Sequence, residues 1–225
     1  MKDIYIALSG ATAAWDQLSA IGNNLANAQT QGFRESRPTF QLAGPDGPMG
    51  SQYVVLGEST FSTENGALTI DDDPNHLAVR GDGFFSLSDG TFTRDGSFHI
   101  NNEGALVTRD GAEVLVGGSP IQLLPGERLA VAPDGTVTGS QSGEIGQISI
   151  VSLTAARPLG GNRWSGTAGE KPKETSVTQG ALEASNADTM RGMIEMMEAS
   201  RYFEAEEKVI KASDELRARL NQMGG

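Results

Sequence analysis

Two amphipathic helical patterns, one at each end of the chain, constrain the fold more than any other feature of the sequence. Between Asp3 and Asn27, apolar or small residues recur in alternating steps of four and three, which keeps one stripe on one face of a helix. The stripe comprises Ile4, Leu8, Ala11, Trp15, Leu18, Gly22 and Leu25. Sustained alternation of this kind favours a coiled-coil seam. Because glycines and asparagines interrupt the segment, burial against a partner has to compensate for its weak helix propensity.

The C-terminal segment from Asn186 to Met223 has a second stripe at helical spacing. It comprises Ile194, Met197, Tyr202, Ala205, Val209, Ala212, Leu216, Leu220 and Met223. On its other faces, glutamates precede lysine or arginine by four residues, as in Glu207 and Lys211, the order that stabilises a helix. Asn186 or Asp188 can cap the helix start. On periodicity alone, a helix pair that packs within one molecule stays open as an alternative.

Composition excludes several classes of function. The 225 residues carry a net charge of −12, whereas nucleic acids and anionic membranes are bound through lysine and arginine. We therefore expect neither nucleic-acid binding nor membrane insertion, and no run of about 18 apolar residues predicts a transmembrane helix. The chain has no cysteine, which excludes disulfides and thiolate chemistry. An amphipathic pattern follows Lys2 and Asp3 directly, so we expect no cleavable secretory signal.

The segments next to the helices predict connectors. Residues 34–76 are rich in proline and glycine and indicate an extended connector with a β-hairpin, whose turn we place at Asn65-Gly66. Residues 154–180 are rich in glycine, proline, lysine and threonine and indicate a return connector. The N-terminal helix and its exit motif then occupy residues 1–33, and the C-terminal helix occupies residues 181–225.

Residues 77–153 predict a central all-β module. Short strand candidates alternate there with Asp-Gly pairs, as at Asp89-Gly90 and Asp134-Gly135, which is typical of a compact antiparallel sandwich or barrel. Thr93-Arg94-Asp95-Gly96 recurs at residues 108–111, and we interpret both copies as hairpin turns. The predicted fold class is α+β, with long terminal helices forming a coiled-coil-like layer and an antiparallel β-module between them.

Candidate catalytic and metal-binding motifs are weak. Gly81-Asp82-Gly83 lacks the third glycine and the following helix of a dinucleotide loop, which favours a turn. Asp71-Asp72-Asp73 lacks the ligand spacing of a calcium loop. His76 and His99 lie in no metal-ligand spacing. Nothing places two carboxylates in a cleft, so a hydrolase using Asp and Glu stays a minor alternative, and we expect no cofactor.

Motifs in three regions of the sequence carry more information together than any one of them alone. The N-terminal stretch is Gly22-Asn23-Asn24-Leu25-Ala26-Asn27, followed by Thr30, Gly32, Phe33 and Arg34. The central stretches are Leu77-Ala78-Val79-Arg80-Gly81-Asp82-Gly83-Phe84-Phe85 and Phe92-Thr93-Arg94-Asp95-Gly96-Ser97-Phe98. The C-terminal stretch is Gly180-Ala181-Leu182-Glu183-Ala184-Ser185-Asn186 with Arg201-Tyr202-Phe203-Glu204. Together these motifs resemble those of the flagellar rod and hook axial proteins, and the resemblance covers both ends and the middle of the chain.

This resemblance implies a structural subunit without catalysis, which adds to a hollow, torque-transmitting helical rod in the bacterial periplasm. It implies export through the flagellar type III apparatus and partners that are copies of the chain and other rod proteins. The short central region and Arg34 resemble the proximal rod type. The alternatives are a distal rod subunit or another axial subunit of the hook family and, from other classes, a secreted cell-wall hydrolase or a monomeric binding module whose terminal helices pair.

We expect the assembly interface on the terminal helices and at the exit of the first helix. It comprises Leu8, Trp15, Leu18, Asn23, Asn24, Leu25, Asn27, Gly32, Phe33, Ile194, Met197, Tyr202, Val209, Leu216 and Leu220. The three asparagines either form hydrogen bonds at a packed junction or end the helix, and both interpretations stay open. Each helix is expected to bury its stripe only against neighbouring subunits, leaving a monomer with poorly ordered ends and a protease-resistant core near residues 35–180.

Overall fold

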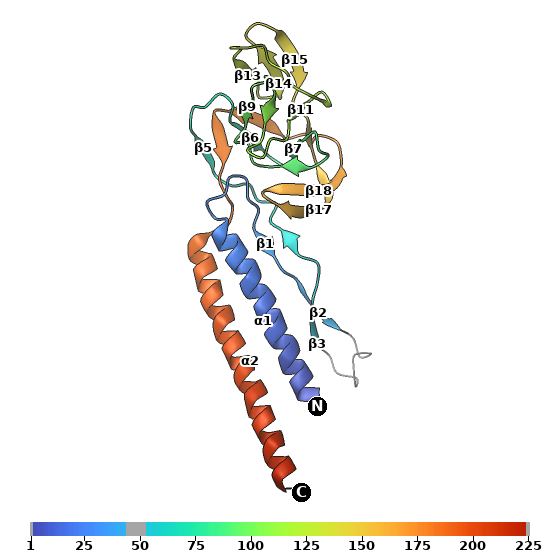
Figure 1. The fold of residues 1–225 in the computed structure, drawn as a ribbon, viewed down its shortest axis with the longest axis vertical. Coiled ribbons are helices and arrows are strands. Elements are labelled where there is room, and N and C mark those ends of the chain that lie inside the picture. Colours follow the sequence, from blue (N-terminus) through green and yellow to red (C-terminus); the bar gives the residue numbers. More distant parts are fainter. Residues whose placement is uncertain (1, 44–52, 224–225) are drawn as a thin grey trace. The chain divides into compact units, whose positions relative to one another are not determined.

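A computed structural model describes residues 2–43 and 53–223, and the chain divides into two compact units (Figure 1). The first unit contains the residues up to Ala28, Glu35–Ser62, and the residues from Ala187 onward. The second unit contains Gln29–Arg34 and Thr63–Asn186. The α+β class is confirmed in this coarse form, because a helix near each end of the chain flanks, in sequence, an antiparallel β region.

The two helices of the first unit are close to those that the sequence predicts. Helix α1 spans Lys2–Ala26 and helix α2 spans Thr189–Met223. Asp188 caps α2, because its Oδ1 accepts hydrogen bonds from the backbone N–H groups of Met190 at 2.9 Å and Arg191 at 3.1 Å. A side-chain acceptor of this kind satisfies N–H groups that have no partner within the helix. One of the two predicted capping residues is therefore confirmed.

Helices α1 and α2 pack antiparallel against each other within the chain. Near one end of the contact Gly22 lies beside Met196, and further along the Trp15 and Phe203 ring centroids are 6.1 Å apart. Beyond them, a Cβ placed on Gly10 would lie only 3.1 Å from Oε1 of Glu206. Small residues on α1 thus allow close approach of the two helices.

The buried face of α1 overlaps the predicted stripe at Ala11 but otherwise lies beside it. The buried apolar residues of α1 are Ala7, Ala11, Ala14 and Ile21, and on α2 Ala199 is buried between the half-buried Gly192, Met196, Phe203, Glu206 and Ile210. Both sets keep the spacing of three and four, but they contain few of the bulky residues of the predicted stripes. The expectation that each helix buries its stripe only against neighbouring subunits stays a prediction for the bulky stripe residues, whereas this seam forms within one chain.

The first unit also contains two antiparallel strand pairs. Strand β1 (Ser36–Arg37) pairs with β4 (Thr60–Phe61), and β2 (Phe40–Ala43) pairs with β3 (Tyr53–Leu56). Strand β3 lies along α1, where the Ser9 hydroxyl accepts a hydrogen bond from the Val54 backbone N–H at 3.3 Å.

The predicted hairpin turn at Asn65-Gly66 is wrong. Strand β5 (Leu68–Ile70) pairs with β20 (Ala181–Glu183) of the second unit instead of with β4. The glycine serves close packing, because a Cβ on Gly66 would lie 1.9 Å from the carbonyl oxygen of Ala184. A residue without a side chain is required there for a reason other than turn geometry.

All the strand pairs described in the second unit are antiparallel. The largest sheet has the order β16 (Ile150–Val151), β7 (Phe84–Ser86), β8 (Phe92–Thr93), β18 (Arg163–Ala168) and β17 (Leu153–Gly160). A smaller sheet has the order β13 (Leu129–Val131), β14 (Thr136–Gly139) and β15 (Gly143–Gln147). The remaining pairs are β6 (Leu77–Arg80) with β19 (Ser176–Gln179), β9 (His99–Ile100) with β10 (Leu106–Val107), and β11 (Leu115–Val116) with β12 (Ser119–Pro120). The largest sheet is open, so the predicted barrel is not formed by it.

Residues 154–180 are not the connector that the sequence predicts. They contain most of the β17–β18 hairpin and the whole of β19. Pro158 lies in β17, an edge strand, where the missing N–H leaves no gap in the interior of the sheet. The turn at Gly160-Gly161-Asn162 has positive φ at all three residues, and it is the sequence signal that indicates this hairpin.

The Asp-Gly turns are confirmed where they join paired strands. Gly90 connects β7 to β8 with φ of 77°, and Gly135 connects β13 to β14 with φ of 91°. The two Thr-Arg-Asp-Gly copies differ. Residues 108–111 form a tight turn, closed by a 2.8 Å hydrogen bond from the Gly111 N–H to the Thr108 carbonyl, whereas residues 93–96 join strands that are not paired and place Arg94 in the interior.

One hydrophobic cluster forms the core of the second unit. It extends from Leu77 and Val79 of β6 to Val177 of β19, and the Phe85 and Phe98 rings meet edge to face at 5.1 Å. Burial of apolar surface on this scale is the main stabilising contribution to a domain of this size. The β region therefore has a core of its own.

Candidate assembly site

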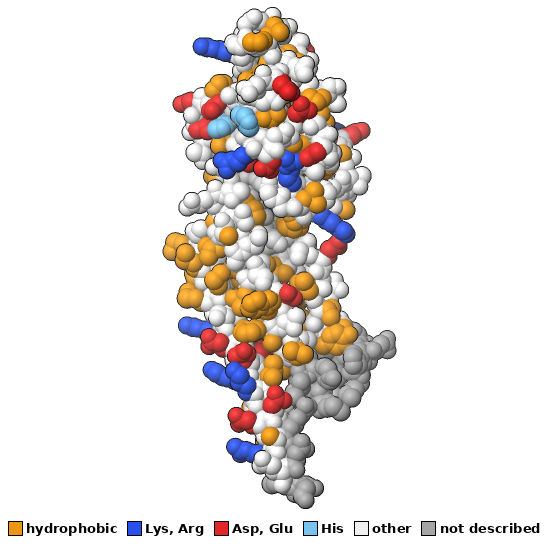
Figure 2. Space-filling view, in the orientation of Figure 1, with side chains coloured by type: hydrophobic (Ala, Val, Ile, Leu, Met, Phe, Trp, Pro, Cys, Tyr) orange, Lys and Arg blue, Asp and Glu red, His pale blue; other side chains and the backbone are white. Residues whose placement is uncertain are grey.

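Bulky apolar side chains remain exposed on both helices of the first unit. On α1, Leu8 is exposed and Trp15 keeps 60% of its surface accessible. The exposed apolar residues of α2 are Met190, Met193, Ile194, Met197, Tyr202, Val209 and Leu216. Figure 2 shows hydrophobic side chains gathered over the first half of α2 and the adjoining part of α1, and charged side chains along the second half of α2. Contiguous exposed apolar surface of this kind marks interaction sites.

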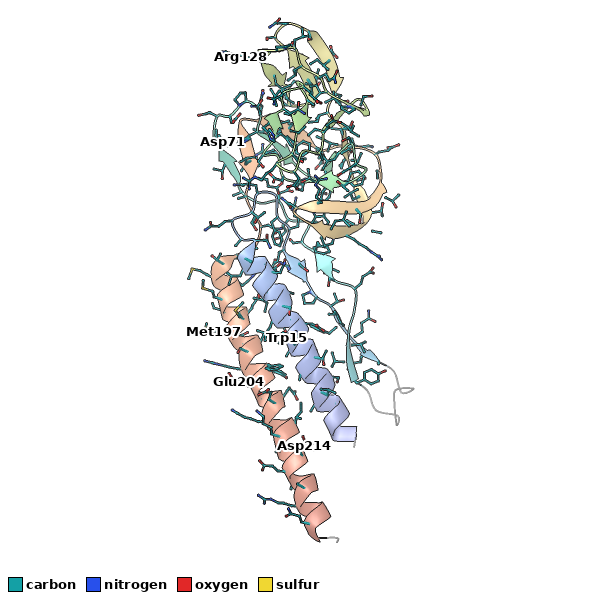
Figure 3. The ribbon with its side chains drawn as sticks, in the orientation of Figure 1. Trp15, Asp71, Arg128, Met197, Glu204 and Asp214 are labelled. Carbon is teal, nitrogen blue, oxygen red and sulfur yellow. The ribbon has the colours of Figure 1, made fainter. Side chains whose placement is uncertain are left out.

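The predicted interface residues fall into three groups by burial. Leu8, Trp15, Asn23, Ile194, Met197, Tyr202, Val209 and Leu216 are exposed, Leu18, Leu25, Asn27 and Phe33 are half-buried, and Asn24 and Gly32 are buried. The side chain of Leu220 lies outside the described residues. Two of these exposed residues, Trp15 on α1 and Met197 on α2, are labelled in Figure 3. The helices bring the exposed group together on one unit.

The methionines of α2 have two different environments. Met190, Met193 and Met197 are exposed, whereas Met196 points into the seam, with its terminal methyl carbon 4.0 Å from a Cβ placed on Gly22. Methionine is flexible and polarizable, and it suits both irregular seams and adaptable binding surfaces. The cluster thus serves helix packing at one residue and leaves three residues on the surface.

Asn24 forms a specific junction at the end of α1. Its Nδ2 donates to the Ser36 carbonyl at 2.8 Å, and its Oδ1 accepts from the Ser36 N–H at 2.9 Å. Asn27 instead donates to the carbonyl of Asn23 at 2.9 Å, which helps to end the helix. Both interpretations of the asparagines are therefore correct, each for a different residue.

An ion-pair cluster that the sequence analysis missed fixes the first turn of α2. Nη2 of Arg191 donates to both carboxylate oxygens of Glu35, at 2.8 and 2.9 Å, and Arg37 donates to the same carboxylate at 2.8 Å. The hydrogen bond to Glu35 raises the pKa of Arg191 above its ordinary value. Glu35 follows the motif that ends in Arg34, but one carboxylate in a polar segment gives no periodic signal. The predicted pair of Glu207 and Lys211 is confirmed, at 3.2 Å.

In the second unit, the predicted residue Gly32 has a structural requirement of its own. Its φ is 66°, and a Cβ would lie 2.5 Å from the carbonyl carbon of Arg94. Its N–H donates to the Glu183 carbonyl at 2.7 Å. The positive φ that the sequence predicts at this glycine is confirmed, and the close approach to Arg94 adds a second reason for it.

Two buried arginines share the carboxylate of Glu183. Arg94 Nε donates to Oε2 at 2.7 Å, and Arg34 Nη2 lies 3.2 Å from Oε1. The remaining donors of Arg94 bind the carbonyls of Val79, Gly81 and Gly83 and the side chain of Asn65. Burial, together with the neighbouring Arg94, lowers the pKa of Arg34 to about 10, which leaves it charged at neutral pH. The cluster ties residues 29–34 and 181–186 to the β region.

The residues of the weak catalytic and metal-binding motifs make contacts that involve no such chemistry. Asp71 is paired with Nδ1 of His76, and the hydrogen bond to His76 is the main effect that lowers the Asp71 pKa, against a raising effect of desolvation. His99 is exposed on β9. Among residues 2–43 and 53–223, no group of three His, Cys, Asp or Glu side chains could hold a metal ion. In the same ranges, no helix is both long and apolar enough to cross a membrane.

Comparison with known families places the chain in a class. A family model described as "Flagella basal body rod protein" matches residues 4–34, "Flagellar hook protein FlgE/F/G D1 domain" matches residues 78–139, and "Flagellar basal body rod FlgEFG protein C-terminal" matches residues 178–223. These matches include most of α1, the whole of α2 and part of the β region between them. The chain belongs to the flagellar basal-body rod protein family.

Relatives from several bacteria match nearly the whole chain. It is 31% identical to the flagellar basal-body rod protein FlgG of Bacillus subtilis, with 96% of each chain covered. It is 32% identical to FlgF of Rhizobium meliloti, with 99% of this chain and 98% of the relative covered, and 27% identical to FlgF of Escherichia coli, with 98% and 97% covered. The chain is therefore a structural subunit of the flagellar basal body and not an enzyme, and the hydrolase alternative finds no support.

Proposed function

We propose that this chain polymerises into the rod through the exposed faces of its α1–α2 pair. The observation that carries the proposal is that small residues pack between the two helices whereas bulky apolar residues stay exposed. Ala7, Ala11 and Ala14 supply the seam within the chain, whereas Trp15 and Met197 stay exposed, the latter with 56% of its surface accessible. A monomer gains nothing from exposed bulky residues, but neighbouring subunits would bury them at about 25 cal/mol per Å² of apolar area.

The neighbours of each subunit are copies of the chain and other rod proteins, arranged as a helical, coiled-coil-like inner layer of a hollow shaft. A tube that grows along its axis needs heterologous contacts, in which one patch of a subunit meets a different patch of the next. Exposed apolar surface on both α1 and α2 supports such contacts, because each helix can meet a different neighbour. Many small interfaces of this kind would resist twisting and transmit torque.

The test compares two substitutions to the same residue on α2. Met197→Gln removes apolar surface at one of the three exposed methionines of α2, and Glu204→Gln changes an exposed charged residue of the same helix; Figure 3 labels both positions. We expect Met197→Gln to reduce incorporation of the chain into isolated basal bodies and Glu204→Gln to leave it unchanged. Both variants should melt at the same temperature as the parent chain, because neither side chain is buried. Equal incorporation of both variants would contradict the proposal.

Within the family we propose the proximal rod position. The alignment with the FlgF relative of Rhizobium meliloti extends over 239 positions and that with the FlgG relative of Bacillus subtilis over 259, whereas this chain has 225 residues. More of the FlgG relative therefore lacks a counterpart here, as the short central region predicts. Immunogold labelling of isolated rods should place this chain at the end nearer the cell interior. Label at the end nearer the hook would assign the chain to the distal position.

We also propose that the chain leaves the cytoplasm through the flagellar type III apparatus. The support is the family to which the chain belongs. Cells with a disabled flagellar export ATPase should retain the tagged chain in the cytoplasm. Appearance of the chain outside the cytoplasm in those cells would contradict this route.

A further inference from the structure

The first unit has an open groove on a different face of α1 from the α2 seam. Residues 8–16 of α1 line one wall and Val54–Leu56 of β3 line the other, enclosing about 320 Å³. Leu8, Val55 and Leu56 in these walls are exposed, so the groove is largely apolar. Of the lining residues that the structure describes, Asp16 is the one with a charged side chain.

The same unit has an overhang at the end of α2. Helix α2 has 35 residues and α1 has 25, and the contacts of Gly10 with Glu206 and of Gly22 with Met196 fix their antiparallel register. In an antiparallel pair, each step back along α1 is matched by a step forward along α2. Counting on from these two contacts places the start of α1 opposite about residue 216 of α2. Leu216–Met223 therefore extends beyond the start of α1, as Figure 1 shows for the C-terminal end of α2. We call these residues the α2 overhang.

We propose that the α2 overhang of one copy of this chain occupies the α1–β3 groove of the next copy. The lengths agree, since eight helical residues extend about 12 Å and residues 8–16 of α1 extend about 13 Å. The overhang offers an exposed apolar side chain at its start, since Leu216 is 61% exposed. Apolar side chains of one helix commonly pack into apolar grooves of a partner.

Charge supports a second copy as the occupant. The chain as a whole carries −12, yet the overhang carries two arginines, Arg217 and Arg219, and no acidic residue. Among the described residues that line the groove, Asp16 is acidic and none is basic. A basic helix end is thus complementary to the one charge in the groove, which favours the docked register over others.

The overhang cannot fill the groove of its own chain. Helix α2 is unbroken to Met223 and runs past the start of α1, while the groove lies alongside residues 8–16 on a face of α1 that α2 does not cover. Groove and overhang are therefore different patches that only separate copies can join. Such a heterologous contact leaves one groove and one overhang free at the two ends and permits continued addition.

Disulfide crosslinking tests the contact directly, because the chain has no native cysteine. Thr12→Cys places a thiol in the groove and Leu216→Cys places one on the overhang. Within one chain these positions lie on the order of 15 Å apart along the helix pair, beyond the roughly 7 Å Cα separation that a disulfide spans. In isolated basal bodies, oxidation of the double variant should produce a ladder of dimers and higher multimers. Either single variant should give no covalent multimers after the same oxidation.

The control pair is Ser19→Cys with Leu216→Cys, since Ser19 is exposed on α1 outside the groove. A ladder from the control pair as strong as that from the Thr12 pair would overturn the docking. Dimers from a single variant would show a self-complementary contact and would also overturn it. A crosslink that mass spectrometry assigns to another rod protein would overturn the choice of a second copy as occupant.

This inference rests on the proposed function, and the two can fail separately. Rods that incorporate the Thr12→Cys/Leu216→Cys variant and support motility, but give no multimers, overturn the docking and leave assembly through the helix pair intact. If that variant is not incorporated, Leu56→Cys with Arg219→Cys probes the same contact from the β3 wall, with the same expected ladder. Rods that form while Met197→Gln is incorporated normally count against the proposed function itself.

Discussion

The side chain of Asn24 and the backbone of Ser36 form a reciprocal pair of hydrogen bonds, with the amide donating at 2.8 Å and accepting at 2.9 Å. Asn24 is buried near the end of α1, and Ser36 begins β1. One amide side chain therefore satisfies both backbone groups of a residue twelve positions further along the chain. This pair sets the course of the chain as it re-enters the first unit after residues 29–34.

Replacing Asn24 by alanine should destabilise the first unit. The substitution leaves the N–H and carbonyl of Ser36 without their partners, which costs about 1 to 3 kcal/mol for a buried group. Asn23→Ala is the matched control, because Asn23 is exposed one residue earlier, and a surface change of this kind stays within about 0.5 kcal/mol. Urea unfolding followed by helical circular dichroism measures both. Equal stability of the two variants would show that Asn24 only ends the helix.

Gly32 and Gly90 separate two reasons for a glycine at positive φ. Gly32 has φ of 66° and a Cβ there would lie 2.5 Å from the Arg94 carbonyl carbon, whereas Gly90 has φ of 77° with nothing within 4 Å. Gly90→Ala should cost only the left-handed conformation, about 1 kcal/mol. Gly32→Ala adds a backbone clash, so its loss should exceed that of Gly90→Ala by more than about 1 kcal/mol. Thermal denaturation of the two variants makes the comparison, and equal losses would refute the close approach.

The extent of the protease-resistant core distinguishes the sequence-based expectation from the structure. The expected core near residues 35–180 omits Gly32, Arg34 and Glu183, yet these residues belong to the second unit. Removing one partner of a buried ion pair costs about 3 to 5 kcal/mol, because the remaining charge is left buried. A fragment of residues 29–186 should therefore melt cooperatively, and a fragment of residues 35–180 should not. The two melting curves would be alike if the Glu183 cluster did not matter.

Glu127 should make the second unit sensitive to acid. Its carboxylate accepts hydrogen bonds from the N–H groups of Leu124 at 2.8 Å, Ser142 at 2.6 Å and Gln141 at 2.9 Å, which lowers the pKa of Glu127 to about 2. A carboxyl group with a lowered folded-state pKa contributes stability that is fully present above its ordinary value, near 4.5, and is lost as the pH falls toward 2.

Glu127→Gln removes this titration. The difference in melting temperature between the parent chain and the variant should be largest above pH 5 and should shrink steadily between pH 4.5 and pH 2. Melting curves at a series of pH values measure it. If the difference in melting temperature stays constant across this range, the charge of the Glu127 carboxylate does not contribute to its hydrogen bonds with the backbone of Leu124, Gln141 and Ser142.

The sequence predicts the elements that local periodicity and turn chemistry determine. The alternation at Leu18 and Leu25 gives helix α1, Asp188 gives the start of α2, and Gly90 and Gly135 give hairpin turns. Periodicity does not determine which of two neighbouring helix faces is covered. The bulky residues define the predicted stripe, but the alanines allow the closer approach and form the seam.

Long-range polar contacts leave no local trace in the sequence. Arg94 and Arg109 occupy equivalent positions in the two Thr-Arg-Asp-Gly copies, yet Arg94 is buried and Arg109 is exposed. What distinguishes them is Glu183, which lies 89 positions beyond Arg94. In the same way, β17 resembles a connector because of Pro158, and only its place at the edge of the sheet makes the proline acceptable.

Methionine oxidation in monomers and in assembled rods tests the central claim, that the exposed face of the helix pair is buried between subunits. In the monomer, Met193 and Met197 are exposed, and hydrogen peroxide should convert both to sulfoxides faster than Met196, which is half-buried in the seam. Peptide mass spectrometry after the same treatment of isolated rods gives the comparison. We predict that the oxidation rates of Met193 and Met197 are lower in rods by about tenfold or more, the factor that corresponds to a free-energy difference of about 1.4 kcal/mol. The oxidation rate of Met196 should change little. Oxidation of Met193 and Met197 at the same rate in rods and monomers would contradict the account.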